Sequence, residues 1–257
     1  MSGRVLITGA SGRIGLALRS RLARPGRTLR LLDVAAPEPG DGVEVLTGTV
    51  TDNALMDAAC AGVDAVVHLG GIPSEAPWEE ILDVNVHGTR TVLEAAARAG
   101  VPRVVLASSN HATGMTPVEP DLPADVALRP DTYYGVSKVA MEALGALYAD
   151  RRGLDVTSLR IGTCAERPRR TRDLATWLSF DDCARLVEAC LAHTGPPAHR
   201  VVWGMSANTR GFASPAAGAA IGYRPQDDAE VFAPDVSGDD EPLVGGMFTR
   251  FPLGERS

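Results

Sequence analysis

Short hydrophobic runs alternate with amphipathic stretches along most of the chain. Continuous runs of Val, Leu, Ile and Ala, bounded by Gly, Pro, Asp or Asn, cover residues 4–8, 28–32, 43–46, 64–69, 103–106 and 155–160. Such runs are typical of strands that are buried on both faces of a parallel sheet. A further run at residues 200–203 reads as a late strand.

Hydrophobic residues with a helical period lie between these runs. They predict helices that end at Arg24 or cover residues 51–61, 78–99, 134–152, 180–193 and 216–221. Alternating strands and helices predict an α/β fold, a doubly wound parallel sheet of the Rossmann type. We expect one domain over residues 1–257, with a core of roughly 1–160. Residues of roughly 161–257 would form a small C-terminal cap on the substrate side, and a tail.

Composition narrows the function classes. The 257 residues carry a net charge of −7, which argues against nucleic acid or an anionic membrane as the main partner. No apolar run approaches the roughly 20 residues that span a bilayer, and the chain starts directly with a strand. Its four cysteines show neither CxxC nor zinc spacing, so we expect free thiols, no metal site and a cytoplasmic protein.

A glycine-rich turn joins the first strand to the first helix. Gly9, Gly12 and Gly15 would allow the tight turn and let backbone N–H groups approach a pyrophosphate at the helix N-terminus. Asp33 ends the second strand, where a carboxylate accepts hydrogen bonds from the adenosine ribose and repels a 2′-phosphate. The turn and Asp33 therefore predict NAD as the cofactor. In isolation, Asp33 could equally open a turn before Pro37.

Lys138 is the sole lysine of a chain that has 24 arginines, and it follows Tyr134 by four residues. Residues at i and i+4 share one face of a helix. An ammonium beside a phenol favours the phenolate, so we expect Lys138 to lower the pKa of Tyr134 and make it a general base. The alternative is a surface Tyr–Lys pair on an amphipathic helix.

Polar residues gather after the fourth and fifth strands. Gly70 and Gly71 follow the fourth strand, whereas His68 inside it is expected to be a packed strand residue. Residues 108–111 place two serines, an asparagine and a histidine after the fifth strand, at the sheet edge where ligands bind. A basic cluster at residues 167–172 could hold an anionic substrate, although most of it would be a solvated loop.

These motifs occur in an order that resembles the extended short-chain dehydrogenases/reductases. They are Thr8-Gly9-Ala10-x-Gly12-x-x-Gly15, Asp33, Asn85-Val86-x-Gly88-Thr89, Ser108-Ser109 and Tyr134-x-x-x-Lys138. Within that group the chain resembles the bacterial uronate dehydrogenases, over nearly its whole length. That likeness rests on residues 68–72, 107–111, 134–138, 176–177 and 201–204.

The resemblance implies NAD-dependent oxidation of D-galacturonate or D-glucuronate at C1 to an aldarolactone. It implies three catalytic residues, Tyr134, Lys138 and Ser109. It places Ser74, Ser109, Asn110, His111, Tyr134, Thr163 and Arg172 at the sugar, with Arg172 on the uronate carboxylate. It places Gly9, Gly12, Arg13, Ile14, Asp33, Thr49, Val50, Leu69, Gly70, Gly71, Asn85, Ser108, Tyr134, Lys138 and Cys164 at the cofactor.

The chain departs from the resemblance at two places. Pro73 stands where the family has a sugar-contacting serine, and the adjacent Ser74 would take that role; Thr49-Val50 stands where the family has Asp-Leu beside adenine. Two other functions fit the motifs, a sugar-nucleotide epimerase or dehydratase and a non-enzymatic NAD-sensing protein. The short stretch after Lys138 argues against the first, and the Tyr134–Lys138 pair against the second. We expect a homo-oligomer.

Overall fold

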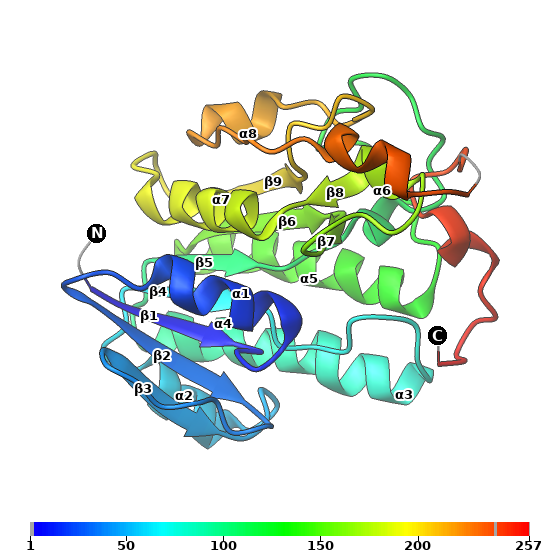
Figure 1. The fold of residues 1–257 in the computed structure, drawn as a ribbon. Coiled ribbons are helices and arrows are strands. Elements are labelled where there is room, and N and C mark those ends of the chain that lie inside the picture. The colour runs from blue at the N-terminus through cyan, green and yellow to red at the C-terminus, as the bar shows by residue number, and fades with distance from the viewer. Residues whose placement is uncertain (1–2, 239–240, 257) are drawn as a thin grey trace.

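Parallel strands form the centre of the computed structural model, which describes residues 3–238 and 241–256. Within those residues the main sheet has seven strands in the order β3-β2-β1-β4-β5-β6-β9, all parallel (Figure 1). The strands are β1 Gly3–Thr8, β2 Arg27–Asp33, β3 Val43–Thr47, β4 Ala65–His68, β5 Arg103–Leu106, β6 Asp155–Ile161 and β9 His199–Gly204. The predicted doubly wound parallel sheet is confirmed.

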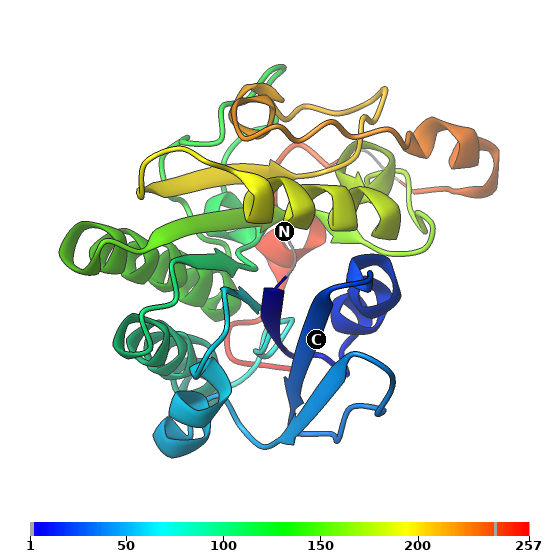
Figure 2. The same ribbon diagram turned by 90° about the vertical axis from the view of Figure 1, so that its left-hand side faces the viewer.

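Helices cover both faces of this sheet (Figure 2). On one face lie α1 Arg13–Leu22 and α7 Phe180–Ala192; on the other lie α2 Asn53–Cys60, α4 Gly88–Arg98 and α5 Tyr133–Arg152. Neighbours in a strand point to opposite faces, so Ile7 packs with the α1 and α7 core and Leu6 with the α2 and α4 core. Both side chains are fully buried, which stabilises the fold by roughly 1.5–3 kcal/mol each.

The chain reverses its direction of travel across the sheet between β1 and β4. From β1 it builds β2 and β3 on one side, and from β4 it builds β5, β6 and β9 on the other. In open parallel sheets such a switch point opens a crevice at the carboxyl ends of the strands, where ligands bind. The fold therefore puts the site at the ends of β1 and β4.

The sheet continues beyond the core that we expected to end near residue 160. Both α7 and β9 belong to it, because β9 pairs with β6 from Val156↔His199 to Ile161↔Gly204. The segments outside the sheet include a two-stranded pair, β7 Thr163–Cys164 with β8 Trp177–Leu178, and the helices α6 Asp173–Thr176 and α8 Ala216–Ala220. Short 3₁₀ segments cover Asn110–Thr113, Ala229–Asp235 and Gly246–Arg250.

The predicted helix over residues 78–99 contains an irregular segment. It starts as α3 Trp78–Glu80, widens to a π-helix over Ile81–His87 and continues as α4. Such π segments are rare and occur frequently at functional sites. Asn85 lies in this one and is completely buried.

Residues 241–256, which we call the C-terminal strap, run along the end of α5 toward α3 (Figure 1, red). The strap pairs with the loop before α5 at Pro117↔Leu243, and Val244 packs in a small core with Leu122 and Trp203. The four cysteines are free thiols and all are buried. Among the described residues, no helix has the length and apolar character needed to cross a membrane.

Candidate active site

The glycine turn between β1 and α1 has the close backbone packing that its sequence predicts. Gly9 has φ +70°, and a Cβ there would lie 2.7 Å from the backbone N of Gly70. A Cβ on Gly15 would lie 2.4 Å from the carbonyl oxygen of Gly9. The turn can therefore approach the end of β4 only because Gly9 lacks a side chain, and α1 can approach the turn only because Gly15 lacks one.

The N-terminus of α1 is open for a phosphate group. Its N-cap is Gly12, no side chain caps the first turn within the described residues, and that turn holds no acidic residue. The free N–H groups and the helix dipole suit an anion. Gly12 and Arg13 are exposed at this turn and Ile14 is half-buried. These residues fit the pyrophosphate of NAD.

Asp33 joins the end of β2 to the glycine turn. Its Oδ2 accepts a hydrogen bond from the backbone N of Ser11 at 2.9 Å, and its Oδ1 accepts one from Ala35 at 3.1 Å. The carboxylate is half-buried and lies at the crevice edge. Thr49 is half-buried at the next turn, and Val50 is buried against Gly70, where a Cβ would lie 3.0 Å from its Cγ1.

The turn after β4 is held by a buried chain of polar groups. His68 bonds Thr8 through Nδ1 at 2.8 Å and Thr89 through Nε2 at 3.2 Å. The Thr8 hydroxyl also accepts the backbone N–H of Gly70 at 3.2 Å. Burial lowers the pKa of His68 to about 3, so it is a neutral packed residue, as expected. At the crevice, Leu69 is half-buried and Gly71 is exposed.

Tyr134, Lys138 and Ser109 lie together where β5 meets α5. The Nζ of Lys138 lies 5.3 Å from the centre of the Tyr134 ring and donates to the carbonyl oxygen of Ala107 at 2.8 Å. Ser109 hydrogen-bonds the Tyr134 phenol. All three side chains are buried, which rules out a surface Tyr–Lys pair.

The expected low pKa of Tyr134 is wrong. Burial raises the pKa of Tyr134 to about 12, the hydrogen bond with Ser109 opposes this rise, and the Asp131 charge adds to it. Burial lowers the pKa of Lys138 to about 8, opposed by the charge of Glu142. Desolvation therefore outweighs the attraction between ammonium and phenolate that the sequence argument relied on.

His111 is fixed beside Tyr134 by partners from three parts of the chain. Its Nδ1 bonds Asp131 Oδ2 at 2.7 Å, its ring stacks on Phe248 of the strap at 4.0 Å, and it meets the Tyr134 ring edge-on at 5.7 Å. The fully buried Asp131 side chain is packed against Gly114 and Gly245. A Cβ on Gly245 would lie 2.0 Å from its Oδ2, so this cradle requires glycine.

Arg172 differs from the other arginines of the basic cluster. Its guanidinium donates to the carbonyl oxygen of Val244 at 2.5 Å, and the same oxygen accepts the Asn110 side-chain amide at 2.9 Å. Burial lowers the pKa of Arg172, and no carboxylate pairs with it in residues 3–238 and 241–256. By contrast, Arg167 forms an exposed ion pair with Asp235. Arg172 therefore differs from Arg167, since its half-buried guanidinium has no carboxylate partner among the described residues.

Thr163 and Cys164 form β7 at the same edge. The Thr163 hydroxyl bonds Asp173 Oδ1 at 3.1 Å and Thr176 at 3.0 Å. Asp173 also accepts the backbone N–H of Arg169 and Arg170, which fixes the loop before Arg172. Cys164 is buried against Cys183.

The side chains of two expected cofactor residues, Asn85 and Ser108, form hydrogen bonds with protein groups. The Asn85 amide is used by Ile72, whose N–H and C=O it bonds at 2.7 and 3.0 Å, and by Ser137 Oγ at 3.0 Å. The Ser108 hydroxyl donates to Glu142 at 2.6 Å. These hydrogen bonds join the π-helix to the turn after β4 and to α5, and the end of β5 to α5. Ser74 lies half-buried beside the exposed Pro73.

Several residues of the site escaped the sequence argument. Glu75 accepts the backbone N–H of Tyr134 at 2.9 Å and that of Gly254 in the strap at 2.8 Å. Asp131, Glu142, Val244 and Phe248 also contact site residues. Glu142 follows Lys138 by four residues, and this spacing places the two on one face of a helix. The other residues act through tertiary contacts that no local pattern encodes.

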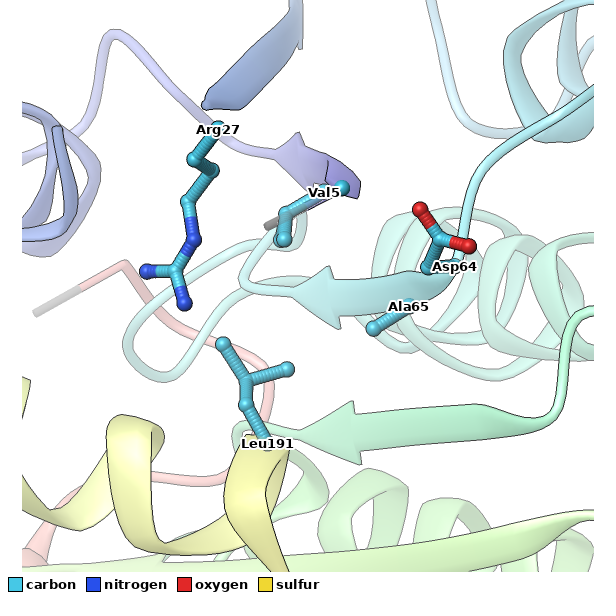
Figure 3. A pocket seen from close by; sticks show the side chains of 6 residues that line it. Val5, Arg27, Asp64, Ala65 and Leu191 are labelled. Carbon is cyan, nitrogen blue, oxygen red and sulfur yellow. The ribbon is translucent and has the colours of Figure 1, made fainter. Parts of the chain in front are cut away.

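A small cavity lies at the opposite edge of the sheet, between the amino ends of β1 and β4 (Figure 3). It has about 10 Å³ and is lined by Gly3, Val5, Arg27, Asp64, Ala65 and Leu191. This volume holds about one water molecule. It is separate from the site at the carboxyl ends.

Comparison with known proteins gives a consistent result. The sequence pattern of the NAD dependent epimerase/dehydratase family matches residues 5–167. A uronate dehydrogenase of Pseudomonas syringae pv. tomato is 39% identical, with 98% of this chain and 96% of that protein covered. The crystal structure of a tyrosine-to-alanine mutant of the Agrobacterium tumefaciens uronate dehydrogenase, complexed with NAD, superposes with a TM-score of 0.92. It is 38% identical, with 98% and 99% of the chains covered.

A relative with another substrate in its name is nearly as similar. The NAD-dependent glucose-6-phosphate dehydrogenase of Haloferax volcanii is 38% identical, over 89% of this chain and 95% of that protein. Each of these relatives is named for an anionic sugar, either a uronate or a sugar phosphate.

Proposed function

The chain belongs to the uronate dehydrogenases of the NAD dependent epimerase/dehydratase family, and on that premise we propose how its residues perform the reaction. The protein is an NAD-dependent oxidoreductase that oxidises a hexuronic acid. Oxidation at C1 of the closed ring gives an aldarolactone. The finer assignments below, from the acting residues to the preferred sugar, are our proposal.

One observation carries the choice of an acidic sugar. The Val244 carbonyl oxygen accepts hydrogen bonds from both Arg172 and Asn110, and Asn110 follows Ser109 directly in the chain. A half-buried guanidinium without a carboxylate partner among the described residues is thereby held beside the reacting groups. Arginine binds carboxylates bidentately, so the uronate carboxylate would complete its environment and orient C1.

Tyr134 acts as the general base in this proposal. Its phenolate takes the proton of the anomeric hydroxyl, and Ser109 donates a hydrogen bond to the same oxygen as charge develops. Lys138, a cation below about pH 8, is the positive charge beside the phenol. A bound NAD would supply the acceptor for the hydride that leaves C1. Asn110, His111, Thr163 and Ser74 would surround the remaining sugar hydroxyls.

The cofactor would lie along the crevice between β1 and β4. Gly9, Gly12, Arg13 and Ile14 would hold the pyrophosphate and Asp33 the adenosine ribose, with Thr49 and Val50 beside the adenine. Leu69, Gly70 and Gly71 would line the centre, and Lys138 and Cys164 the nicotinamide end. We also propose that the protein acts in the cytoplasm, as a homo-oligomer and without nucleic-acid partners. Light scattering of the purified protein tests the oligomeric state.

The test is NADH formation from a panel of sugars, combined with two tyrosine variants. We expect turnover of galacturonate and glucuronate and little turnover of glucose or glucose 6-phosphate. Tyr134→Phe should lower kcat by about 10²–10⁴-fold with unchanged NAD affinity, since only a proton acceptor is lost. Tyr133→Phe, the neighbouring tyrosine, is the matched control and should keep its rate. An active Tyr134→Phe enzyme, or turnover of the neutral sugar alone, contradicts the proposal.

A further inference from the structure

Helix α5 presents three buried ionisable groups on one face. Tyr134, Lys138 and Glu142 follow one another at intervals of four residues, and each residue is at most 8% exposed. The first two face the reacting atoms in the proposed function. Glu142 lies one turn further into the protein and has no part in that chemistry.

Glu142 holds the strand end that contacts both of the other groups. Its Oε1 accepts the Ser108 hydroxyl at 2.6 Å. On one side of Ser108, the Ala107 carbonyl oxygen accepts the Lys138 ammonium at 2.8 Å. On the other side, Ser109 hydrogen-bonds Tyr134. A single carboxylate oxygen therefore fixes the peptide from which both contacts are made.

Arg160 of β6 fixes Glu142 in turn. Its Nε and Nη2 donate to the two carboxylate oxygens at 3.0 and 2.9 Å, and both side chains are at most 5% exposed. Arg160 also donates to the carbonyl oxygen of Ala124 at 2.8 Å and lies over the Trp203 ring at 5.8 Å. The bidentate geometry holds the carboxylate in one orientation, with Oε1 placed to accept the Ser108 hydroxyl.

We propose that Glu142, held by Arg160, is a positioning residue that keeps Lys138 charged and aligns Ala107 and Ser109 with the Tyr134–Lys138 pair. The proposal rests on the function proposed above for that pair. The Glu142 carboxylate accounts for both effects. Its Oε1 binds Ser108, which aligns the strand end, and its negative charge lies one helical turn from the Lys138 ammonium.

The charges around this unit favour the same conclusion. Lys138 is faced by Tyr134 and Glu142 from α5 and by His68 from β4, and His68 is neutral because burial lowers its pKa to about 3. Glu142 is faced by Arg160 from β6 and His199 from β9. Burial alone disfavours the ammonium, and Glu142 opposes that effect. Without Glu142, the remaining charged group next to Ser108 would be the cation Arg160.

The single lysine makes a direct test possible. Protein made with [ε-¹³C]lysine has one labelled side chain, so its NMR signal reports the titration of Lys138 without substrate or turnover. We expect Glu142→Gln to move the titration midpoint down by roughly one pH unit or more. The double variant Glu142→Gln/Arg160→Gln leaves no unpaired buried cation and should move it down by a smaller amount. Glu94→Gln removes a carboxylate that bonds Tyr148, also on α5, and should leave the midpoint unchanged.

Kinetics supply the second readout. Glu142→Gln and Ser108→Ala should each lower kcat by about tenfold, while the affinity for NAD and the KM for the uronate change by less than about twofold. A Lys138 midpoint that shifts by less than about 0.3 pH unit in both Glu142 variants overturns the proposal. So does a loss of NAD binding in parallel with kcat, which marks general unfolding. The NMR result does not depend on which sugar is oxidised, so the two proposals can fail separately.

Discussion

At Tyr134 and Lys138, burial opposes charge. The phenol and the ammonium are both desolvated, so the pKa of the first rises to about 12 and that of the second falls to about 8. Each shift favours the neutral form. Burial therefore opposes the phenolate that the proposed mechanism uses, and the charge of the neighbouring amine depends on Glu142 and on a pH below about 8.

His68 leads to a prediction about stability at low pH. Burial lowers its pKa from 6.5 to about 3, so between these values the unfolded chain binds a proton that the folded protein excludes. The stability from a neutral His68 is complete above about pH 6.5 and is lost as the pH falls toward 3. The loss is at most about 5 kcal/mol, from 1.36 kcal/mol per pH unit.

The free energy of unfolding, measured between pH 3 and 7, checks this prediction. His68→Gln should be less stable at pH 7 but depend less on pH, because Gln does not titrate. His87→Gln changes an exposed histidine and is the control. If the His68→Gln curve keeps the slope of the parent protein, another group causes the acid sensitivity.

At the scale of elements, the hydrophobic runs located the strands of the sheet closely. The run at 28–32 became Arg27–Asp33, and the run at 155–160 became Asp155–Ile161. Elements with little or no periodic signal were missed, including the two-residue strands β7 and β8. The π-helix at Ile81–His87 was read as ordinary helix, because seven residues are too few to separate the two periods.

The start of α5 leads to a second prediction. Glu75 accepts the N–H of Tyr134 and is 2% exposed, so Glu75→Ala leaves a buried donor unpaired and shifts the helix that carries the base. We expect a loss of about 2 kcal/mol in the free energy of unfolding and a lower kcat. Glu75→Gln keeps an acceptor and should lose less.

Glu80→Ala is the matched control, because Glu80 pairs with Arg256 of the same strap at the surface. An exposed pair of this kind contributes at most about 1 kcal/mol. Equal losses from Glu75→Ala and Glu80→Ala would show that both residues only hold the strap. Chemical denaturation and steady-state kinetics distinguish these outcomes.

At the scale of the molecule, the site is made from segments that are far apart in the chain. Residues whose type signals their chemistry could be identified from the sequence, such as Tyr134, Lys138 and the glycines. Val244 could not, because it contributes a backbone carbonyl oxygen, which every residue has. Asp131 and Glu75 were hidden for a related reason: a carboxylate buried by tertiary contacts looks like a surface one in the sequence.

The strap leads to a prediction about the whole chain. Removal of residues 241–257 takes away Val244, which holds Arg172 and Asn110, and Phe248, which stacks on His111. We expect NAD binding to persist, since the glycine turn and Asp33 lie elsewhere, while kcat/KM for the uronate falls at least about 100-fold. Removal of residues 255–257 alone should cost little.

Titration calorimetry with NAD and a uronate assay separate the two effects. A truncated protein that loses both activities together would show that the strap is needed for folding as a whole. A truncated protein that keeps full uronate turnover would show that Arg172 and His111 hold their positions without it.

The strap follows every strand of the main sheet in the chain, which also orders the protein's biosynthesis. Domains fold from the N-terminus as they emerge from the ribosome, and every strand of the main sheet precedes residue 205. The nascent chain can therefore complete its nucleotide crevice before the wall of its sugar pocket has been translated. Truncated messenger RNAs that lack the codons for the strap would then yield proteins that bind the cofactor but do not oxidise the sugar.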